Sequence, residues 1–187
     1  LASGRPAHNL DTFLMEPAVV EASFWARARG RDLAVVEGNR GLFDGFDVMG
    51  SHSSAALARQ LSLPIILVLT VDQMEESVAA HVRGCRVLEP DLPLAGVVLN
   101  RVWDGHHEGI LRRALEAEGV PVLGVIPPLE EELLPSRHLG LVTPEEHHRA
   151  AHIVDRLATV GEGCLRLNEL LRHARQTGVL CQRIVLR

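Results

Sequence analysis

The stretch AVVEGNRGLFDG, residues 34–45, changes abruptly from a buried-type strand pattern to a glycine-rich loop. Its β-branched and apolar run ends at Glu37. The residues that follow interleave glycines with polar side chains: Gly38, Asn39, Arg40, Gly41, Asp44 and Gly45. An ordinary turn needs one or two glycines, because each supplies backbone freedom at a single position. We therefore expect a strand that leads into a loop built to hold a charged group.

Three further apolar runs resemble the one that ends at Glu37. The four predicted strands are residues 33–36, 65–71, 94–99 and 122–126. All are rich in Val, Ile and Leu without alternation, which is typical of strands buried on both faces of a parallel sheet. Helical patterns cover residues 17–29, 51–61, 75–88 and 108–118. This order predicts the α/β class, with a doubly wound, mainly parallel sheet and helices on both faces.

The rest of the chain continues the pattern less regularly. A proline-rich loop is predicted for residues 127–142, followed by helices over 144–160 and 167–174. Residues 176–187 suit an edge strand or a linker. The length allows one domain with its own core, which we place at residues 1–175.

Composition argues against several classes of function. The 187-residue chain has a net charge of -5, so neither nucleic acid nor an acidic membrane is expected as a partner. No apolar run approaches the roughly 20 residues of a membrane span, and the first residues lack a signal-peptide pattern. Cys85, Cys164 and Cys181 are widely spaced and odd in number, which favours a reducing, cytoplasmic compartment. All 19 basic residues are arginine, so these residues supply no lysine chemistry.

Each predicted strand ends at a residue that could serve a ligand: Glu37, Asp72, Asn100 and Pro127. Ligands of open α/β sheets bind beyond these carboxyl ends. Glu37 either holds Mg²⁺ or only caps the following turn, and Asp44 favours the metal because two carboxylates can share the ion. Arg40, between them, would meet an anionic group with its planar guanidinium.

Asn100 and the histidines allow two interpretations each. The Asn100 amide matches the donor and acceptor of an adenine edge, although an Asx turn is the more common use of such a residue. Arg137 and His138 lie in the long loop after the fourth strand, and such loops often act as lids that touch substrate. The histidine pairs at 106–107 and 147–148 indicate metal binding only weakly, because adjacent helical side chains point to different sides.

Seven segments together resemble the cobyrinic acid a,c-diamide synthase family, with its siroheme and sirohydrochlorin amidating relatives. In chain order they are GRPAHNLDTFLM (4–15), VEGNRGLFDG (36–45), GSHSSAALARQL (50–61), GVVLNRV (96–102), HHEGILRRAL (106–115), PVLGVIP (121–127) and LPSRHLGLV (134–142). Each segment is weak alone, but all follow the family's order and approximate spacing. The resemblance covers almost the whole chain.

The resemblance implies a P-loop-type α/β domain, similar to dethiobiotin synthetase, that binds ATP and Mg²⁺. It also implies amidation of the peripheral carboxylates of a tetrapyrrole, through an acyl phosphate and ammonia derived from glutamine. By position, Glu37 and Asp44 resemble metal ligands, and Arg40 resembles a catalytic residue beside them. The remaining implied contacts are Asn100, Arg101 and Pro127 for the nucleotide and Asp11, Ser51, Arg137 and His138 for the substrate.

The chain also departs from the family. The family's first strand and its phosphate loop ending in Gly-Lys-Thr have no counterpart in these residues, and its glutaminase domain, the expected partner that supplies ammonia, lies outside them. Residues 1–175 thus resemble a partial synthetase domain, expected to be inactive alone and compatible with a homodimer. Two alternatives stay open, a degenerate module that binds a partner or tetrapyrrole without turnover and a relative of dethiobiotin synthetase. Asn39-Arg40 is closer to the siroheme branch, so the macrocycle is not determined.

Overall fold

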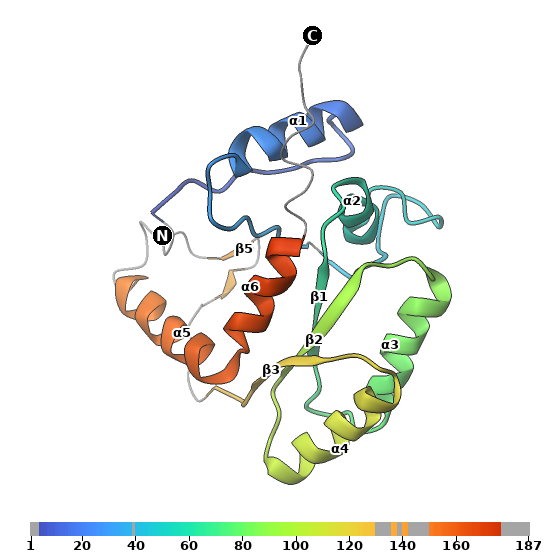
Figure 1. The fold of residues 1–187 in the computed structure, drawn as a ribbon, viewed down its shortest axis with the longest axis vertical. Coiled ribbons are helices and arrows are strands. Elements are labelled where there is room, and N and C mark those ends of the chain that lie inside the picture. Colours follow the sequence, from blue (N-terminus) through green and yellow to red (C-terminus); the bar gives the residue numbers. More distant parts are fainter. Residues whose placement is uncertain (1–3, 39, 130–135, 138–139, 142–149, 177–187) are drawn as a thin grey trace. The chain divides into compact units, whose positions relative to one another are not determined.

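The computed structural model describes residues 4–38, 40–129, 136–137, 140–141 and 150–176. Figure 1 shows their helices and strands in chain order. The helices are α1 (Pro17–Ala28), α2 (Ser54–Gln60), α3 (Ser77–Leu88), α4 (Gly105–Ala117), α5 (Ala150–Cys164) and α6 (Leu167–Gln176). The strands are β1 (Ile65–Thr70), β2 (Leu94–Asn100), β3 (Val122–Ile126), β4 (Ser136–Arg137) and β5 (Gly140–Leu141). The predicted α/β class is confirmed, and three of the four predicted strands form.

Two compact units contain these elements. The first consists of the described residues within 1–8, 68–82 and 97–167, and the second of those within 9–67, 83–96 and 168–187. β1, β2 and α3 contribute residues to both units. The first unit holds β3, α4 and α5, whereas the second holds α1, α2 and the glycine-rich loop.

The main sheet is parallel, in the order β1-β2-β3, with β2 in the middle (Figure 1). β2 and β3 pair in parallel, with Leu99 opposite Val125, after an irregularity between Val97 and Val98. Leu99 is completely buried, and the adjacent Val98, whose side chain points to the opposite face of the strand, is only 5% exposed. The burial on both faces that the apolar run predicts is therefore found at β2.

The core of the first unit lies around β3. Helices α4 and α5 both contact this strand. Leu111 and Leu115 of α4 are fully buried, and their spacing of four places them on one face of the helix. After α5, the Arg166 backbone N–H donates to the Leu123 carbonyl oxygen at 2.8 Å. Gly119 follows α4 with a φ of 64°, as the predicted helix end requires.

In the second unit, α1 packs with α2. The Gln60 side-chain amide donates to the Pro17 carbonyl oxygen at 2.8 Å. Val20 and Ala55 have no exposed surface. The Ser53 hydroxyl caps α2 by accepting from the Ala56 backbone N–H at 3.2 Å.

The prediction of a strand at residues 33–36 is wrong. This segment forms no strand in the described part of the chain, and Leu33 and Val35 are 47% and 83% exposed. A strand requires a neighbour for its N–H and C=O groups, and the described sheet has only β1, β2 and β3. An apolar run shows that a segment suits a sheet, but pairing decides whether it becomes a strand.

The segment after β3 also differs from the prediction. Within the predicted loop at 127–142, β4 and β5 pair antiparallel, with Ser136 opposite Leu141. Part of that loop, the first residues of the predicted helix at 144–160 and residues 177–187 lie outside the described residues. Among the residues that are described, no helix is long and apolar enough to cross a membrane.

Candidate functional site

The described residues within 37–53, in the second unit, form a loop with several internal backbone hydrogen bonds. The Asp44 N–H donates to the Gly41 carbonyl oxygen at 3.1 Å, and the Asp44 carboxylate accepts from the Gly41 N–H at 3.2 Å. The Ala55 N–H donates to the Leu42 carbonyl oxygen at 3.0 Å. This last bond fastens the loop to the first turn of α2.

The three predicted catalytic residues of this loop, Glu37, Arg40 and Asp44, are all exposed. Arg40 has a φ of 72°, a conformation that is uncommon outside glycine and clusters at functional sites. The described residues contain no group of three or more His, Cys, Asp or Glu side chains that could hold a metal ion. Two exposed carboxylates still suit Mg²⁺, which keeps several water ligands and takes phosphate oxygens.

The glycines of the loop permit close approaches as well as turns. A Cβ atom on Gly38 would lie 2.9 Å from the Ser54 hydroxyl oxygen. A Cβ atom on Gly45 would collide with the Ser51 carbonyl oxygen. The contact at Gly45 involves a backbone atom, which cannot move away by a change of rotamer as the Ser54 side chain can. The glycine-rich pattern therefore has a structural cause in addition to the predicted ligand.

Replacing Gly45 with alanine is expected to lower the free energy of unfolding by about 1–3 kcal/mol, the usual penalty of forcing atoms into a packed site. Gly84 of α3 is the matched control, since nothing lies within 4 Å of a Cβ added there. Gly84→Ala is expected to raise stability by about 0.5–1 kcal/mol, because alanine is the better helix former. Urea unfolding followed by circular dichroism measures both. Equal stability of Gly45→Ala and the wild type would contradict the close approach.

Asp47 organises the second half of the loop. Its carboxylate accepts from the Met49 N–H at 3.0 Å and the Ser51 N–H at 3.1 Å. These bonds, led by the one from the Ser51 backbone, lower the pKa of Asp47. Ser51, a predicted substrate contact, therefore serves the loop itself, and the structural role of Asp47 was missed in the sequence.

Asp11, another predicted substrate contact, also has a structural task. Its carboxylate oxygen Oδ1 accepts from the Phe13 N–H at 2.9 Å and from the Leu14 N–H at 3.0 Å. This is an Asx turn, the common use of an aspartate in such a position. The bonds account for the NLD segment without any ligand, and the contact with substrate remains a prediction.

In the first unit, polar groups meet where β1 and β2 end. The Arg101 guanidinium lies 3.6 Å from the Asp72 carboxylate, and the Trp103 indole N–H donates to the Asp72 carbonyl oxygen at 3.0 Å. The half-buried Asn100 follows the same strand, and its carbonyl oxygen accepts from the Val71 N–H at 2.9 Å. Arg101 has a φ of 64°. The predicted nucleotide contacts Asn100 and Arg101 therefore stand beside Asp72, at the expected edge of the sheet.

A cavity of about 380 Å³ lies in the same unit, between the strand ends, α4 and the end of α5. Its lining includes Val102, Trp103, Glu108, Arg112, Pro127 and Cys164. Glu108 and Arg112 form an ion pair at 2.6 Å. Pro127, a predicted contact of the nucleotide base, thus borders a cavity, and Trp103, which also lines it, is a residue that the sequence interpretation missed. Its only sequence signal is a large aromatic ring directly after the NRV segment.

The described residues give little support for a functional role of the remaining candidate residues. Arg137 lies in β4, and His138 lies outside the described residues. His107 is engaged, because its Nε2 is 2.7 Å from the Met74 carbonyl oxygen. Cys85 is a free cysteine whose pKa is raised by burial, which disfavours a reactive thiolate. No catalytic thiol is therefore indicated there.

Comparison with known families gives one match over most of the chain. The model described as "CobQ/CobB/MinD/ParA nucleotide binding domain" matches residues 20–142. This range contains the glycine-rich loop, the strand ends and the cavity-lining residues up to Pro127. No solved structure matches.

Curated proteins with similar sequences are longer than this chain. A hydrogenobyrinate a,c-diamide synthase from Streptomyces coelicolor is 43% identical over 96% of the chain, and a cobyrinate a,c-diamide synthase from Magnetococcus marinus is 42% identical over 91%. A cobyrinate a,c-diamide synthase from Archaeoglobus fulgidus is 36% identical over 93%. The chain spans only 37–38% of the length of these relatives.

Proposed function

Because the chain belongs to the CobQ/CobB/MinD/ParA nucleotide-binding domain family, we propose that it is the ATP-dependent part of a tetrapyrrole-amidating ligase. The complete protein would convert peripheral carboxylates to amides with nitrogen from glutamine. The observation that carries the proposal is the similarity to a,c-diamide synthases along nearly the entire chain. A glutaminase domain would be the partner that supplies ammonia. The protein would be cytoplasmic, and assembly as a homodimer is compatible with this function.

The proposed reaction has two steps. A carboxylate oxygen of the tetrapyrrole attacks the γ-phosphorus of ATP, the bond from that phosphorus to the bridging oxygen breaks, and ADP leaves. Ammonia then attacks the acyl carbon of the acyl phosphate, the carbon–oxygen bond to phosphate breaks, and inorganic phosphate leaves while nitrogen loses a proton. The first step brings two anions together, so it depends on positioning and on cationic groups.

The exposed loop of the second unit supplies suitable groups for this step. Glu37 and Asp44 would hold Mg²⁺ with hard carboxylate oxygens, and one Asp44 oxygen is already oriented by the Gly41 N–H. When bound, the ion would screen the repulsion between the carboxylate and the γ-phosphoryl group. Arg40 would place its guanidinium against the γ-phosphate or the substrate carboxylate. Each of these oxyanions presents two oxygens that can accept the paired N–H groups of a guanidinium.

The first unit supplies the proposed nucleotide contacts. Asn100 offers the donor and acceptor that an adenine edge needs. Pro127 borders the cavity and would line the base. Arg101 is 60% exposed in its side chain although it pairs with Asp72, so it remains accessible to a nucleotide. Arg137 and His138 stay proposed substrate contacts together with Asp11 and Ser51.

The test is turnover by the full-length protein. Cobyrinic acid and hydrogenobyrinic acid are each incubated with ATP, Mg²⁺ and glutamine, and the products are analysed by mass spectrometry while ADP is measured. We expect one ADP for each hydroxyl replaced by an amino group, with one of the two macrocycles preferred. Tetrapyrrole binding without any ADP release would instead favour the module that binds without turnover.

A further inference from the structure

Two loops of the second unit bring three aromatic rings together. The ring centroids of Phe13 and Phe46 are 5.0 Å apart, with the rings tilted by 35°. The His52 ring stands edge-on to both, at 5.6 Å from Phe13 and 6.5 Å from Phe46. Aromatic residues make up only 3% of the chain, with four phenylalanines in all. Two of those four meet in this cluster, which we call the aromatic cluster.

The backbone beneath the aromatic cluster is held in place. Asp11 fixes the turn that carries Phe13 through the two hydrogen bonds of its Asx turn. The Phe46 N–H donates to the Ser51 carbonyl oxygen at 2.8 Å, so Phe46 and His52 flank a closed loop. His52 has a φ of 66°, which is unusual for a residue that is not glycine. Such fixed positions suit recognition, because little freedom is lost when a ligand binds.

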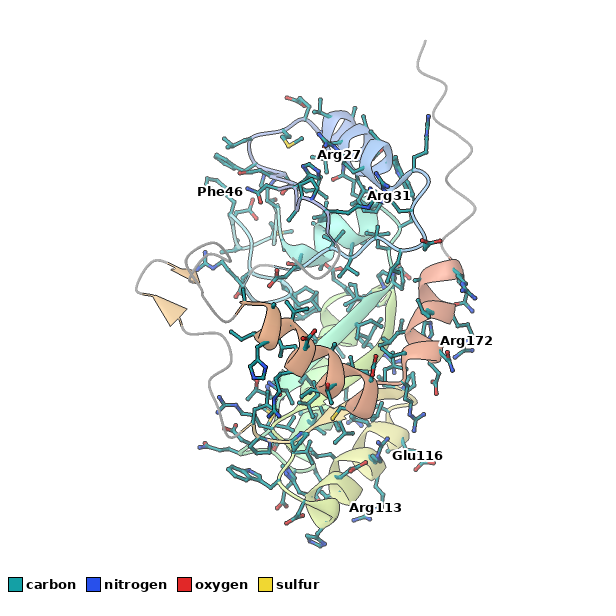
Figure 2. The ribbon with its side chains drawn as sticks, turned by 90° about the vertical axis from the view of Figure 1, so that its left-hand side faces the viewer. Arg27, Arg31, Phe46, Arg113, Glu116 and Arg172 are labelled. Atoms are coloured by element: carbon teal, nitrogen blue, oxygen red, sulfur yellow. The ribbon has the colours of Figure 1, made fainter. Side chains whose placement is uncertain are left out.

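The aromatic cluster is nevertheless open to solvent. Phe13 is 59% exposed and Phe46 is 72% exposed, and Figure 2 shows Phe46 at the surface. Large apolar neighbours on the same two loops are exposed too, namely Leu14 at 78%, Val48 at 102% and Met49 at 86%. Single exposed apolar residues are normal, whereas a group of this kind marks a binding surface.

We propose that the aromatic cluster contacts the flat face of the tetrapyrrole macrocycle, an inference that rests on the proposed function. A tetrapyrrole has an apolar, largely planar centre and carries its carboxylates at the rim. It therefore needs an aromatic surface for its centre and cationic groups for its edge. Phe46 and His52 belong to the same loop as Arg40, so the loop offers both kinds of group within a short stretch of chain.

The acidic residues near the aromatic cluster do not oppose this assignment. The carboxylates of Asp11 and Asp47 each accept two backbone N–H bonds, which offset their negative charge toward an anionic ligand. The alternative ligand of the aromatic cluster is a protein surface, such as that of another domain. The experiment below distinguishes a bound tetrapyrrole from a bound protein.

The experiment titrates full-length protein with cobyrinic acid, followed by visible absorption, and separately with a fluorescent ATP analogue. Phe46→Ala and Phe13→Ala are each expected to raise the Kd for cobyrinic acid about tenfold, since stacking contacts are lost. Affinity for the ATP analogue should not change. Phe46→Tyr should retain binding, and Val87→Ala, at a 73% exposed position of α3, serves as the matched control.

Three outcomes would overturn the assignment. If Phe46→Ala and Phe13→Ala bind cobyrinic acid as tightly as the wild type, the aromatic cluster is not its surface, although the proposed function stands. If these variants instead change the elution volume or the coupling to glutamine hydrolysis while cobyrinic acid binding is retained, the surface belongs to a protein contact. If the wild type binds neither cobyrinic acid nor hydrogenobyrinic acid, both the inference and this substrate class fail.

Discussion

Glu37→Gln in the full-length protein is expected to lower kcat for amidation about a thousandfold while leaving the fold intact. Glutamine has the same shape and can still hydrogen-bond, and Glu37 is exposed, so packing at this position should survive. The variant loses the negative charge with which Glu37 would hold Mg²⁺ beside the phosphates. Steady-state release of ADP measures the change, and circular dichroism checks the fold.

Ammonium salts distinguish the defective step in this variant. If Glu37 acts in the phosphoryl transfer, replacing glutamine with free ammonia should not restore turnover, because the carboxylate is never activated. A defect in ammonia supply would be rescued. Glu116, which lies on α4 at the surface in Figure 2, provides the control Glu116→Gln with expected wild-type turnover. Near-normal turnover of Glu37→Gln would leave Glu37 as the cap of a glycine-rich turn.

Arg40→Met is expected to raise the KM for ATP or for the tetrapyrrole ten- to a hundredfold, the usual effect of losing a charge-assisted hydrogen bond. Methionine has a similar length but no charge. Stability should change little, because Arg40 is exposed and both residues share the strain of its φ of 72°. Initial rates at varied ATP and varied tetrapyrrole show which ligand the guanidinium contacts.

Arg40→Lys and Arg113→Met complete this experiment. Lysine keeps the charge but not the planar fork, so it should restore part of the affinity if the contact is to an oxyanion. Arg113 is exposed on α4, as Figure 2 shows, and its replacement removes one positive charge far from the loop in sequence. If Arg40→Met and Arg113→Met behave alike, Arg40 is only a surface charge.

Local patterns in the sequence were sufficient for much of the fold. The apolar runs at 65–71, 94–99 and 122–126 contain β1, β2 and β3, and the helical periodicities correspond to α1 through α6. Ser53 and Gly119 mark helix ends through their own side chain or backbone. These features depend on neighbours a few residues away, which a sequence displays directly.

The tertiary structure alone decided what depends on distant partners. Residues 33–36 have the composition of a strand, yet no described strand pairs with them, so they form none. Likewise, Asp72 and Trp103 meet only because β1 and β2 end at one edge of the sheet, and Phe13 reaches Phe46 only because two loops close beside each other. Composition and spacing carry no record of such pairings. Local preferences are compatible with many arrangements of the chain. The burial of apolar surface and the entropy cost of closing loops determine which of these arrangements forms.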